Sequence, residues 1–180
     1  MQLNLSPSAP EKSPRICCFT GHRRIPEEHI PHLYRLTDEA IIALYKEGVR
    51  IFRAGGALGF DTIAALRVLR MKAVDLPDIS LHLILPCREQ ASKWSQSDID
   101  QYNLILECAD SVTYTSESYI SGCMQIRNHA LLKDSDYCIA YLRASTGGTA
   151  YTVTKAFRKD IPVFNLADYI PKEDPYKRFS

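Results

Sequence analysis

The chain has 180 residues, with 22 lysines and arginines against 21 aspartates and glutamates, and a formal net charge of +1. This balance argues against a protein whose main task is to coat nucleic acid or a membrane, because both need a basic excess. A content of 46% hydrophobic residues is typical of one globular domain with its own core. No apolar run approaches the ~20 residues of a membrane span, so we expect no membrane partner.

Both ends of the chain are rich in proline, serine and charged residues. We therefore expect tails over residues 1–14 and 170–180 around a single domain over residues 15–169. The first residues contain no cationic stretch followed by an apolar one, which predicts a cytoplasmic protein without a secretory signal. The six cysteines have no CxxC spacing. This favours reduced structural thiols, no metal site and no required cofactor.

Short apolar runs alternate with segments of helical periodicity between the tails. The apolar runs predict strands at residues 16–19, 49–52, 81–85, 111–114, 137–141 and 161–164. The last of these is predicted to be an edge strand or to start late, because Pro162 cannot donate a ladder hydrogen bond. The helical patterns cover residues 30–45, 60–71, 99–109, 119–133 and 150–159.

The alternation of strand and helix predicts the fold class. Most of the apolar runs are nearly continuous, as expected for parallel strands that are buried on both faces. We therefore predict an α/β fold that is Rossmann-like and doubly wound. Its mainly parallel sheet would have about six strands, with helices on both faces.

The chain has only eight glycines, and three clusters of them follow predicted strands directly before a helix. The clusters are Thr20-Gly21-His22-Arg23, Gly55-Gly56-Ala57-Leu58-Gly59-Phe60-Asp61 and Gly147-Gly148-Thr149. The carboxyl ends of parallel strands lie at one edge of the sheet, and open α/β sheets bind their ligands at that edge. The three clusters therefore predict one shared ligand site.

The residues in these clusters suit an anionic ligand. A glycine before a helix lets backbone N–H groups approach an anion closely, and the helix dipole favours negative charge there. Thr20 and Thr149 add hydroxyl donors. Arg23 and Arg127 can each hold a phosphate through two parallel hydrogen bonds. A small phosphorylated metabolite, foremost a nucleotide, fits this chemistry.

Structural alternatives exist for each of these residues. Glycines also occur in turns that bind nothing, and neither GxGxxG nor GxxxxGK[ST] is present. Trp94 could stack on a base or cover the sheet edge. Asp61 could bond a ribose hydroxyl or compensate a helix dipole. Arg127 and Asn128 could lie on a solvated helix face, and His22 could act as an acid or a base.

The three glycine clusters, together with Arg127-Asn128, resemble in order and spacing the YpsA-like branch of the SLOG superfamily. That superfamily also includes Smf/DprA and the Lonely Guy phosphoribohydrolases. The resemblance covers roughly residues 15–165. It implies a Rossmann-like fold and a pocket for a nucleotide or an ADP-ribose-like ligand, in a bacterial, cytoplasmic protein. Some relatives are linked to cell division or stress responses.

The same resemblance bears on activity. Lonely Guy enzymes cleave the base from nucleoside monophosphates with an arginine and the glutamate of a Gly-Gly-x-Gly-Thr-x-x-Glu motif. Aligning Gly148-Thr149 with this motif places Thr152 at the glutamate, and a hydroxyl cannot replace a carboxylate beside an oxocarbenium-like centre. Glu89 or Asp61 could supply a carboxylate from another loop, so the sequence leaves catalysis open. We do not expect single-stranded DNA as a partner, because a net charge of +1 offers little phosphate-neutralising surface.

We therefore predict a protein that binds or senses a nucleotide-like metabolite. The alternatives are an N-glycosidase, and an interaction module with a protein partner or a second copy of the chain. No catalytic residue and no metal ligand is assigned. The predicted ligand-binding residues are Thr20, Gly21, His22, Arg23, Gly55, Gly56, Ala57, Gly59, Phe60, Asp61, Trp94, Arg127, Asn128, Gly147, Gly148 and Thr149.

Overall fold

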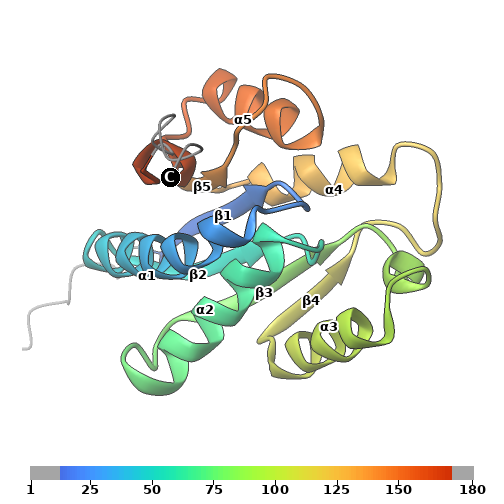
Figure 1. Cartoon of the computed structure of the whole chain (residues 1–180), viewed down its shortest axis with the longest axis horizontal. Helices are drawn as coiled ribbons and strands as arrows, with labels where there is room; N and C mark the ends of the chain where they lie inside the picture. Colours follow the sequence, from blue (N-terminus) through green and yellow to red (C-terminus); the bar gives the residue numbers. More distant parts are fainter. Residues whose placement is uncertain (1–12, 172–180) are drawn as a thin grey trace, which may run out of the picture.

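The computed structural model describes residues 13–171, and its centre is one sheet of six parallel strands (Figure 1). The strand order is β4–β3–β2–β1–β5–β6. The strands are β1 (Arg15–Gly21), β2 (Val49–Ala54), β3 (Ser80–Leu85), β4 (Ser111–Tyr114), β5 (Tyr137–Tyr141) and β6 (Val163–Asn165). The predicted Rossmann-like, doubly wound fold is confirmed, and every strand pair is parallel.

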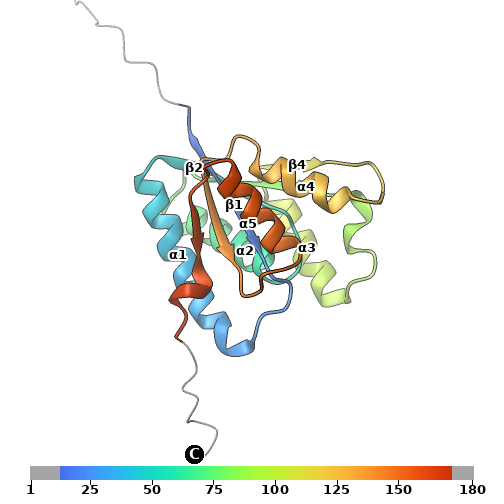
Figure 2. The same cartoon turned by 90° about the horizontal axis from the view of Figure 1, so that it is seen from above.

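Residues 13–171 also form five α-helices and three short 3-10 helices, of which η3 follows the last strand. The α-helices are α1 (Ile30–Lys46), α2 (Phe60–Val74), α3 (Gln96–Cys108), α4 (Cys123–Leu132) and α5 (Gly148–Arg158). The 3-10 helices are η1 (Glu27–His29), η2 (Arg88–Ala91) and η3 (Leu166–Tyr169). Helices α1 and α2 pack together on one face of the sheet, and α4 and α5 pack together on the other. The view from above shows α5 in front of β1 (Figure 2).

The side chains of β1 alternate between the two faces of the sheet, as the period of a strand requires. Cys17 and Phe19 belong to the larger core cluster beneath α1 and α2. Cys18 belongs to a smaller cluster beneath α4 and α5, with Leu131 and Ala156. Both faces of β1 are therefore dry, which explains the nearly continuous apolar run in its sequence.

Several element boundaries differ from the sequence-based prediction, and the starts of α4 and α3 differ most among the helix starts. Helix α4 begins at Cys123 rather than at residue 119, because Gly122 adopts the left-handed conformation (φ 82°) directly before it. Helix α3 begins earlier than residue 99, since the Ser95 side chain accepts a hydrogen bond from the Asp98 N–H and caps the helix. The predicted late start of the last strand is confirmed, because β6 is an edge strand that begins after Pro162.

Strands β1 and β5 lie side by side where the winding of the sheet reverses. From β1 the chain proceeds to β2 on one side, and from β5 it proceeds to β6 on the other. In open α/β sheets this arrangement leaves a crevice beyond the carboxyl ends of the two strands. None of the described helices is long and apolar enough to cross a membrane. Most of the predicted tails, at residues 1–12 and 172–180, lie outside the described residues.

Candidate functional site

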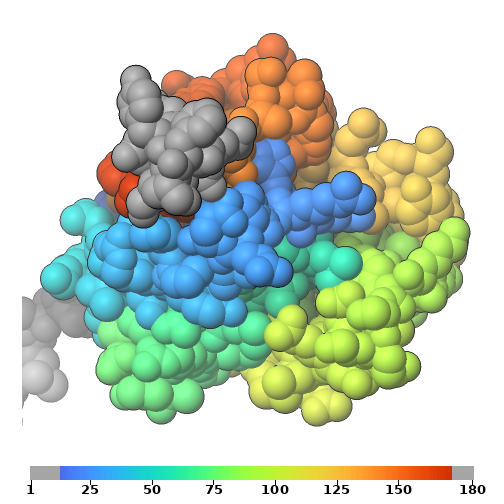
Figure 3. All heavy atoms as spheres, viewed as in Figure 1, coloured from blue at the N-terminus to red at the C-terminus, as the bar shows by residue number. Residues whose placement is uncertain are grey.

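A cavity of about 370 Å³ lies at this crevice. Its walls come from the end of β1 and the loop after it, from the loop before α2 and the first turn of α2, from α4, and from the start of α5. In the space-filling view, the segment that follows β1 (blue) lies between α5 (orange) and the green segments below it (Figure 3). The lining residues are Phe19, Thr20, Gly21, His22, Arg23, Ala57, Asp61, Met124, Arg127, Asn128, Leu131, Gly148 and Thr149.

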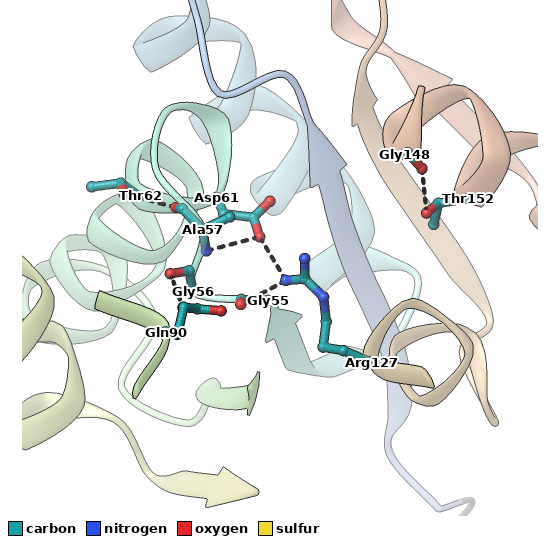
Figure 4. Close-up of polar contacts among 9 residues, drawn as sticks. All are labelled: Gly55, Gly56, Ala57, Asp61, Thr62, Gln90, Arg127, Gly148 and Thr152. Atoms are coloured by element: carbon teal, nitrogen blue, oxygen red, sulfur yellow. Dashed lines mark hydrogen bonds and ion pairs between the residues drawn. The ribbon is translucent and has the colours of Figure 1, made fainter. Parts of the chain in front are cut away.

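Arg127 of α4 reaches across the cavity to the loop after β2 (Figure 4). Its Nη1 donates to the Gly55 carbonyl oxygen at 2.6 Å and lies 3.4 Å from Oδ2 of Asp61. The two charged side chains are 8% and 5% exposed. Nε of Arg127 is also buried and has no partner within residues 13–171. The guanidinium group is therefore held at one nitrogen and keeps unused donor capacity beside the cavity.

Burial opposes the charge of both members of this pair. It raises the pKa of the Asp61 carboxyl, although Arg127 and the Ala57 N–H act in the other direction. It also lowers the pKa of Arg127, against the attraction of Asp61. The attraction between Arg127 and Asp61 thus does not fully offset the cost of burying their charges. Arg23 adds a second positive charge to the cavity wall. An anion bound beside Arg127 would offset this cost.

The start of α5 forms another wall of the cavity. Gly147 precedes the helix with φ 96°, a conformation that side-chain-bearing residues rarely adopt. The first N–H groups of a helix have no partner within the helix, and the helix dipole makes this end positive. Thr149, in the first turn of the helix, lines the cavity together with Gly148. Backbone and hydroxyl donors therefore face the same space as Arg127.

His22 connects two of the loops that form the site. Its Nε2 accepts a hydrogen bond from the Arg143 N–H at 2.8 Å, which ties the loop after β1 to the loop after β5. This bond requires Nε2 to be unprotonated. Burial and the neighbouring charge of Arg143 both lower the pKa of His22, so both favour the neutral ring.

The cavity brings together most of the residues predicted from the sequence. Those that line it are Thr20, Gly21, His22, Arg23, Ala57, Asp61, Arg127, Asn128, Gly148 and Thr149. The solvated-face alternative for Arg127 is wrong, because that residue is buried. The remaining predicted residues do not line this cavity and are Gly55, Gly56, Gly59, Phe60, Trp94 and Gly147.

Three of these remaining residues have packing roles, two of them next to the site. A Cβ on Gly55 would lie 1.6 Å from Nη1 of Arg127, so only glycine leaves room for the guanidinium group. Phe60 is fully buried, and its ring centroid lies 6.3 Å from that of Phe19. Trp94 packs edge-on against Tyr102 at 5.3 Å, on the α3 side of the sheet.

Sequence reasoning missed three apolar residues of the lining, Phe19, Met124 and Leu131. A signal for two of them was present, because Met124 and Leu131 stand three positions before and four positions after Arg127 on one helix. Residues at these spacings lie on the same helical face. Phe19 is the last apolar residue of the run in β1 and lies directly before the Thr20-Gly21 cluster.

Thr152 does not reach the cavity. Its hydroxyl donates to the Gly148 carbonyl oxygen at 2.9 Å inside α5, and the residue is 1% exposed. Asp61 is the carboxylate that lines the cavity. The Glu89 carboxylate instead accepts a hydrogen bond from the Tyr119 N–H, at 3.2 Å.

The cysteines and the metal-binding side chains form no site of their own within the described part of the chain. All six cysteines are free, and Cys108 is the exposed one. No group of three or more histidine, cysteine, aspartate or glutamate side chains among residues 13–171 could hold a metal ion.

Proteins of similar sequence align with most of the chain. The chain is 31% identical over 133 residues to the UPF0398 protein BH1768 of Halalkalibacterium halodurans, which covers 72% of this chain and 70% of that protein. It is 30% identical over 122 residues to a UPF0398 protein of Bacillus cereus, which covers 66% of each chain. These names describe no activity.

Solved structures share the fold at lower identity. DNA processing protein A of Helicobacter pylori aligns with a TM-score of 0.60 and 20% identity, over 90% of this chain and 67% of that one. DprA of Streptococcus pneumoniae aligns with a TM-score of 0.64 and 14% identity, over 91% of this chain. The chain spans about half of the pneumococcal protein, 52% of its length.

One expectation about partners is wrong. A net charge of +1 led us not to expect nucleic acid. The Helicobacter pylori protein, which shares this fold, is described by its single-stranded DNA binding mode. This finding overturns the exclusion, because a net charge averaged over a chain does not report on a local binding surface.

The family is established by the sequence as a whole. The YpsA model, which describes the YspA SLOG family, matches residues 18–163. This match contains all the residues that line the cavity. It agrees with the order of the glycine clusters and with the UPF0398 relatives. The chain therefore belongs to the YspA SLOG family.

Proposed function

We propose that this protein binds a nucleoside phosphate, as a free nucleotide or a derivative such as an ADP-ribose-like molecule, and acts as a sensor or regulator. The observation that carries the proposal is the buried Arg127, whose Nε lacks a partner within residues 13–171. This side chain lies in a cavity that also contains the start of α5. A phosphate group satisfies both features, since it accepts from a guanidinium group and from first-turn N–H groups.

The other lining residues favour a nucleoside phosphate over a bare anion. Asp61 offers a carboxylate that can accept from a ribose hydroxyl, and Asn128 offers an amide that can both donate and accept. Phe19, Met124 and Leu131 supply apolar wall. A volume of about 370 Å³ lies within the range of small-molecule sites. The family resemblance supports the same class of ligand.

The position of Thr152 supports binding rather than hydrolysis of the Lonely Guy type. Its hydroxyl is engaged with Gly148 inside α5. A carboxylate at this point of the helix is what the Lonely Guy motif requires for base cleavage. With Thr152 in place of that carboxylate, the cavity can hold a nucleotide, but α5 supplies no carboxylate for cleaving its base.

Isothermal titration with AMP, ADP-ribose and inorganic phosphate tests the proposal. A ligand present at 100 times its Kd adds about 2.7 kcal/mol of stability, which thermal unfolding also detects. Arg127→Ala should reduce the affinity for AMP at least tenfold, since a charge-assisted hydrogen bond contributes about 1.5–3 kcal/mol. The matched control is Arg35→Ala, which removes an exposed arginine of α1 that pairs with Glu39.

Thr149→Val provides a second variant if Arg127→Ala does not fold. It removes only the cavity hydroxyl and should weaken AMP binding about fivefold to tenfold. Unchanged AMP affinity in both variants, or no binding of any phosphorylated ligand to the folded wild-type chain, would refute the proposal.

Asp61 favours a second candidate function, an N-glycosidase. It is a carboxylate inside the cavity beside Arg127, and burial raises its pKa. Catalytic carboxylates occur in such environments. Incubation with AMP, followed by chromatography for free adenine, tests this function. Adenine that accumulates with the wild type and not with Asp61→Asn would establish it, and its absence would leave binding as the function.

Single-stranded DNA also presents phosphate groups and bases, so it is a second possible form of the ligand. The fold similarity to the Helicobacter pylori protein makes this form worth a separate arm of the titration. A fluorescent oligo-dT of about 20 nucleotides should compete with AMP if both use the Arg127 cavity. Binding of the oligonucleotide with a steep salt dependence and no competition would indicate a different surface.

A further inference from the structure

A second hollow of about 460 Å³ adjoins the cavity. The two share Met124, Asn128 and Gly148 as a common wall, so a ligand at the start of α5 can extend into both. The second hollow lies between the start of α4, the segment before it and the start of α5. Its lining consists of Tyr119, Ser121, Gly122, Cys123, Met124, Gln125, Asn128, Gly147, Gly148 and Tyr151.

The two spaces differ in charge. The first is lined by Arg23, Arg127 and Asp61. The second contains no acidic or basic side chain in its lining. It offers instead two tyrosines, a methionine and the amides of Gln125 and Asn128. The first space therefore suits a charged group, and the second suits a neutral group with a flat apolar face and a hydrogen-bonding edge.

The segment before α4 presents large apolar side chains to solvent. Tyr119 is 69% exposed and Ile120 is 47% exposed. The backbone of this segment is held in place, since the Tyr119 N–H donates to Oε2 of Glu89 at 3.2 Å. An exposed aromatic ring at the rim of a hollow has a face available for stacking.

Tyr151 of α5 also lines the hollow and is already packed. Its ring stacks on His129 with a centroid distance of 6.0 Å, and its hydroxyl lies 3.1 Å from Nε2 of the same histidine. Tyr151 is thus a fixed wall. Tyr119, which is 69% exposed against 37% for Tyr151, is the ring that a ligand can cover.

We infer that the second hollow receives the base of the ligand. The phosphate lies at Arg127 and the start of α5, the base covers the ring of Tyr119, and the Asn128 and Gln125 amides bond its edge. This assignment rests on the proposed function and goes further, because it places the two ends of a nucleotide in two adjoining spaces of opposite chemistry.

Paired titrations with AMP and ribose 5-phosphate test the inference, because ribose 5-phosphate carries a hydroxyl where AMP carries its base. Wild type should bind AMP at least tenfold more tightly than ribose 5-phosphate. Tyr119→Ala should weaken AMP binding about tenfold, the size of one stacking interaction, and leave ribose 5-phosphate unchanged. Tyr119→Phe keeps the aromatic face and should retain wild-type affinity for both ligands.

Tyr169→Ala is the exposure-matched control, since Tyr169 is 64% exposed and lies on η3, outside both lining sets. It should change neither affinity. Equal losses of AMP and ribose 5-phosphate in Tyr119→Ala, or equal affinities of wild type for the two ligands, would overturn the inference while leaving phosphate binding intact. If the proposed function itself is wrong, the wild-type protein will bind neither ligand.

Discussion

The carbonyl oxygen of Gly55 lies 2.6 Å from Nη1 of Arg127, although the two residues are 72 positions apart in the chain. Gly55 follows β2 and Arg127 lies on α4, so this hydrogen bond joins the loop after β2 to α4, behind the cavity lining. The contact is possible because position 55 has no side chain. A Cβ there would lie 1.6 Å from Nη1 of Arg127 and 2.8 Å from Oδ2 of Asp61.

Gly55→Ala should therefore displace Arg127 and disturb both properties of the protein. We expect the free energy of unfolding to fall by about 2–3 kcal/mol, because a buried charge loses its partners. Ligand affinity should fall at least tenfold. Urea denaturation and AMP titration measure the two effects. Gly148→Ala is the control for stability, since a Cβ at position 148 meets no atom within 4 Å. A Gly55→Ala protein with wild-type affinity would contradict the assigned role of Arg127.

Asp61→Asn should change stability and phosphate affinity in opposite directions. The substitution leaves Arg127 as a buried charge without its carboxylate partner, which costs about 3 kcal/mol of folding stability. It also removes the negative charge from the cavity wall, so inorganic phosphate should bind more tightly than to wild type, by about threefold to tenfold. Denaturation and phosphate titration of the same samples provide the comparison. A parallel loss of both would indicate that Asp61 serves only to position Arg127.

Ligand binding should weaken in acid through His22. The pKa of folded His22 is below its usual value, so the unfolded chain takes up the proton first. The stability from this residue is complete above the usual histidine pKa of about 6.5 and is lost as the pH falls through the lower folded pKa. A protonated Nε2 cannot accept from the Arg143 N–H, which releases the loop before α5.

Unfolding and AMP titrations between pH 5 and pH 8, in wild type and His22→Gln, measure this dependence. The difference between the two proteins isolates His22 from the other histidines. His32→Gln, on α1, serves as the control and should follow the wild-type profile. If His22→Gln and wild type lose affinity in parallel as the pH falls, the His22–Arg143 hydrogen bond does not govern the loop.

Trp94 should contribute to stability and not to ligand binding. It contacts the core at Tyr102, and it lines neither the Arg127 cavity nor the adjoining second hollow. Trp94→Phe should lower the free energy of unfolding by about 1–2 kcal/mol through lost packing, and AMP affinity should not change. Circular dichroism in urea gives the first quantity and calorimetry the second. A clear loss of AMP affinity in this variant would restore Trp94 as a base contact.

Much of the fold is predictable because it depends on local patterns. The continuous apolar runs of β1, β3 and β5 and the helical period of α1 are short-range properties of the chain. The helix boundaries are less predictable where backbone conformation decides them. Gly122 ends the preceding segment through a left-handed φ, and the residue pattern from position 119 onward continues without a break.

The candidate site is predictable to the extent that it follows the sheet edge. Thr20-Gly21-His22-Arg23 and Gly148-Thr149 line one cavity because parallel strands end at one edge. The separate roles within the second glycine cluster are not predictable, since Ala57 and Asp61 line the cavity while Gly55 supports Arg127 from outside the lining.

The sequence by itself determined the parallel α/β fold, the edge of the sheet where the glycine clusters gather, and the family. These follow from apolar periodicity and from residue order, which are properties of neighbouring positions. Only the tertiary structure decided that Arg127 is buried and held by Gly55 and Asp61, and that Tyr119 borders an uncharged hollow beside it. Burial and charge pairing depend on side chains that approach from distant positions, at separations of 66 and 72 residues, and no local pattern records them.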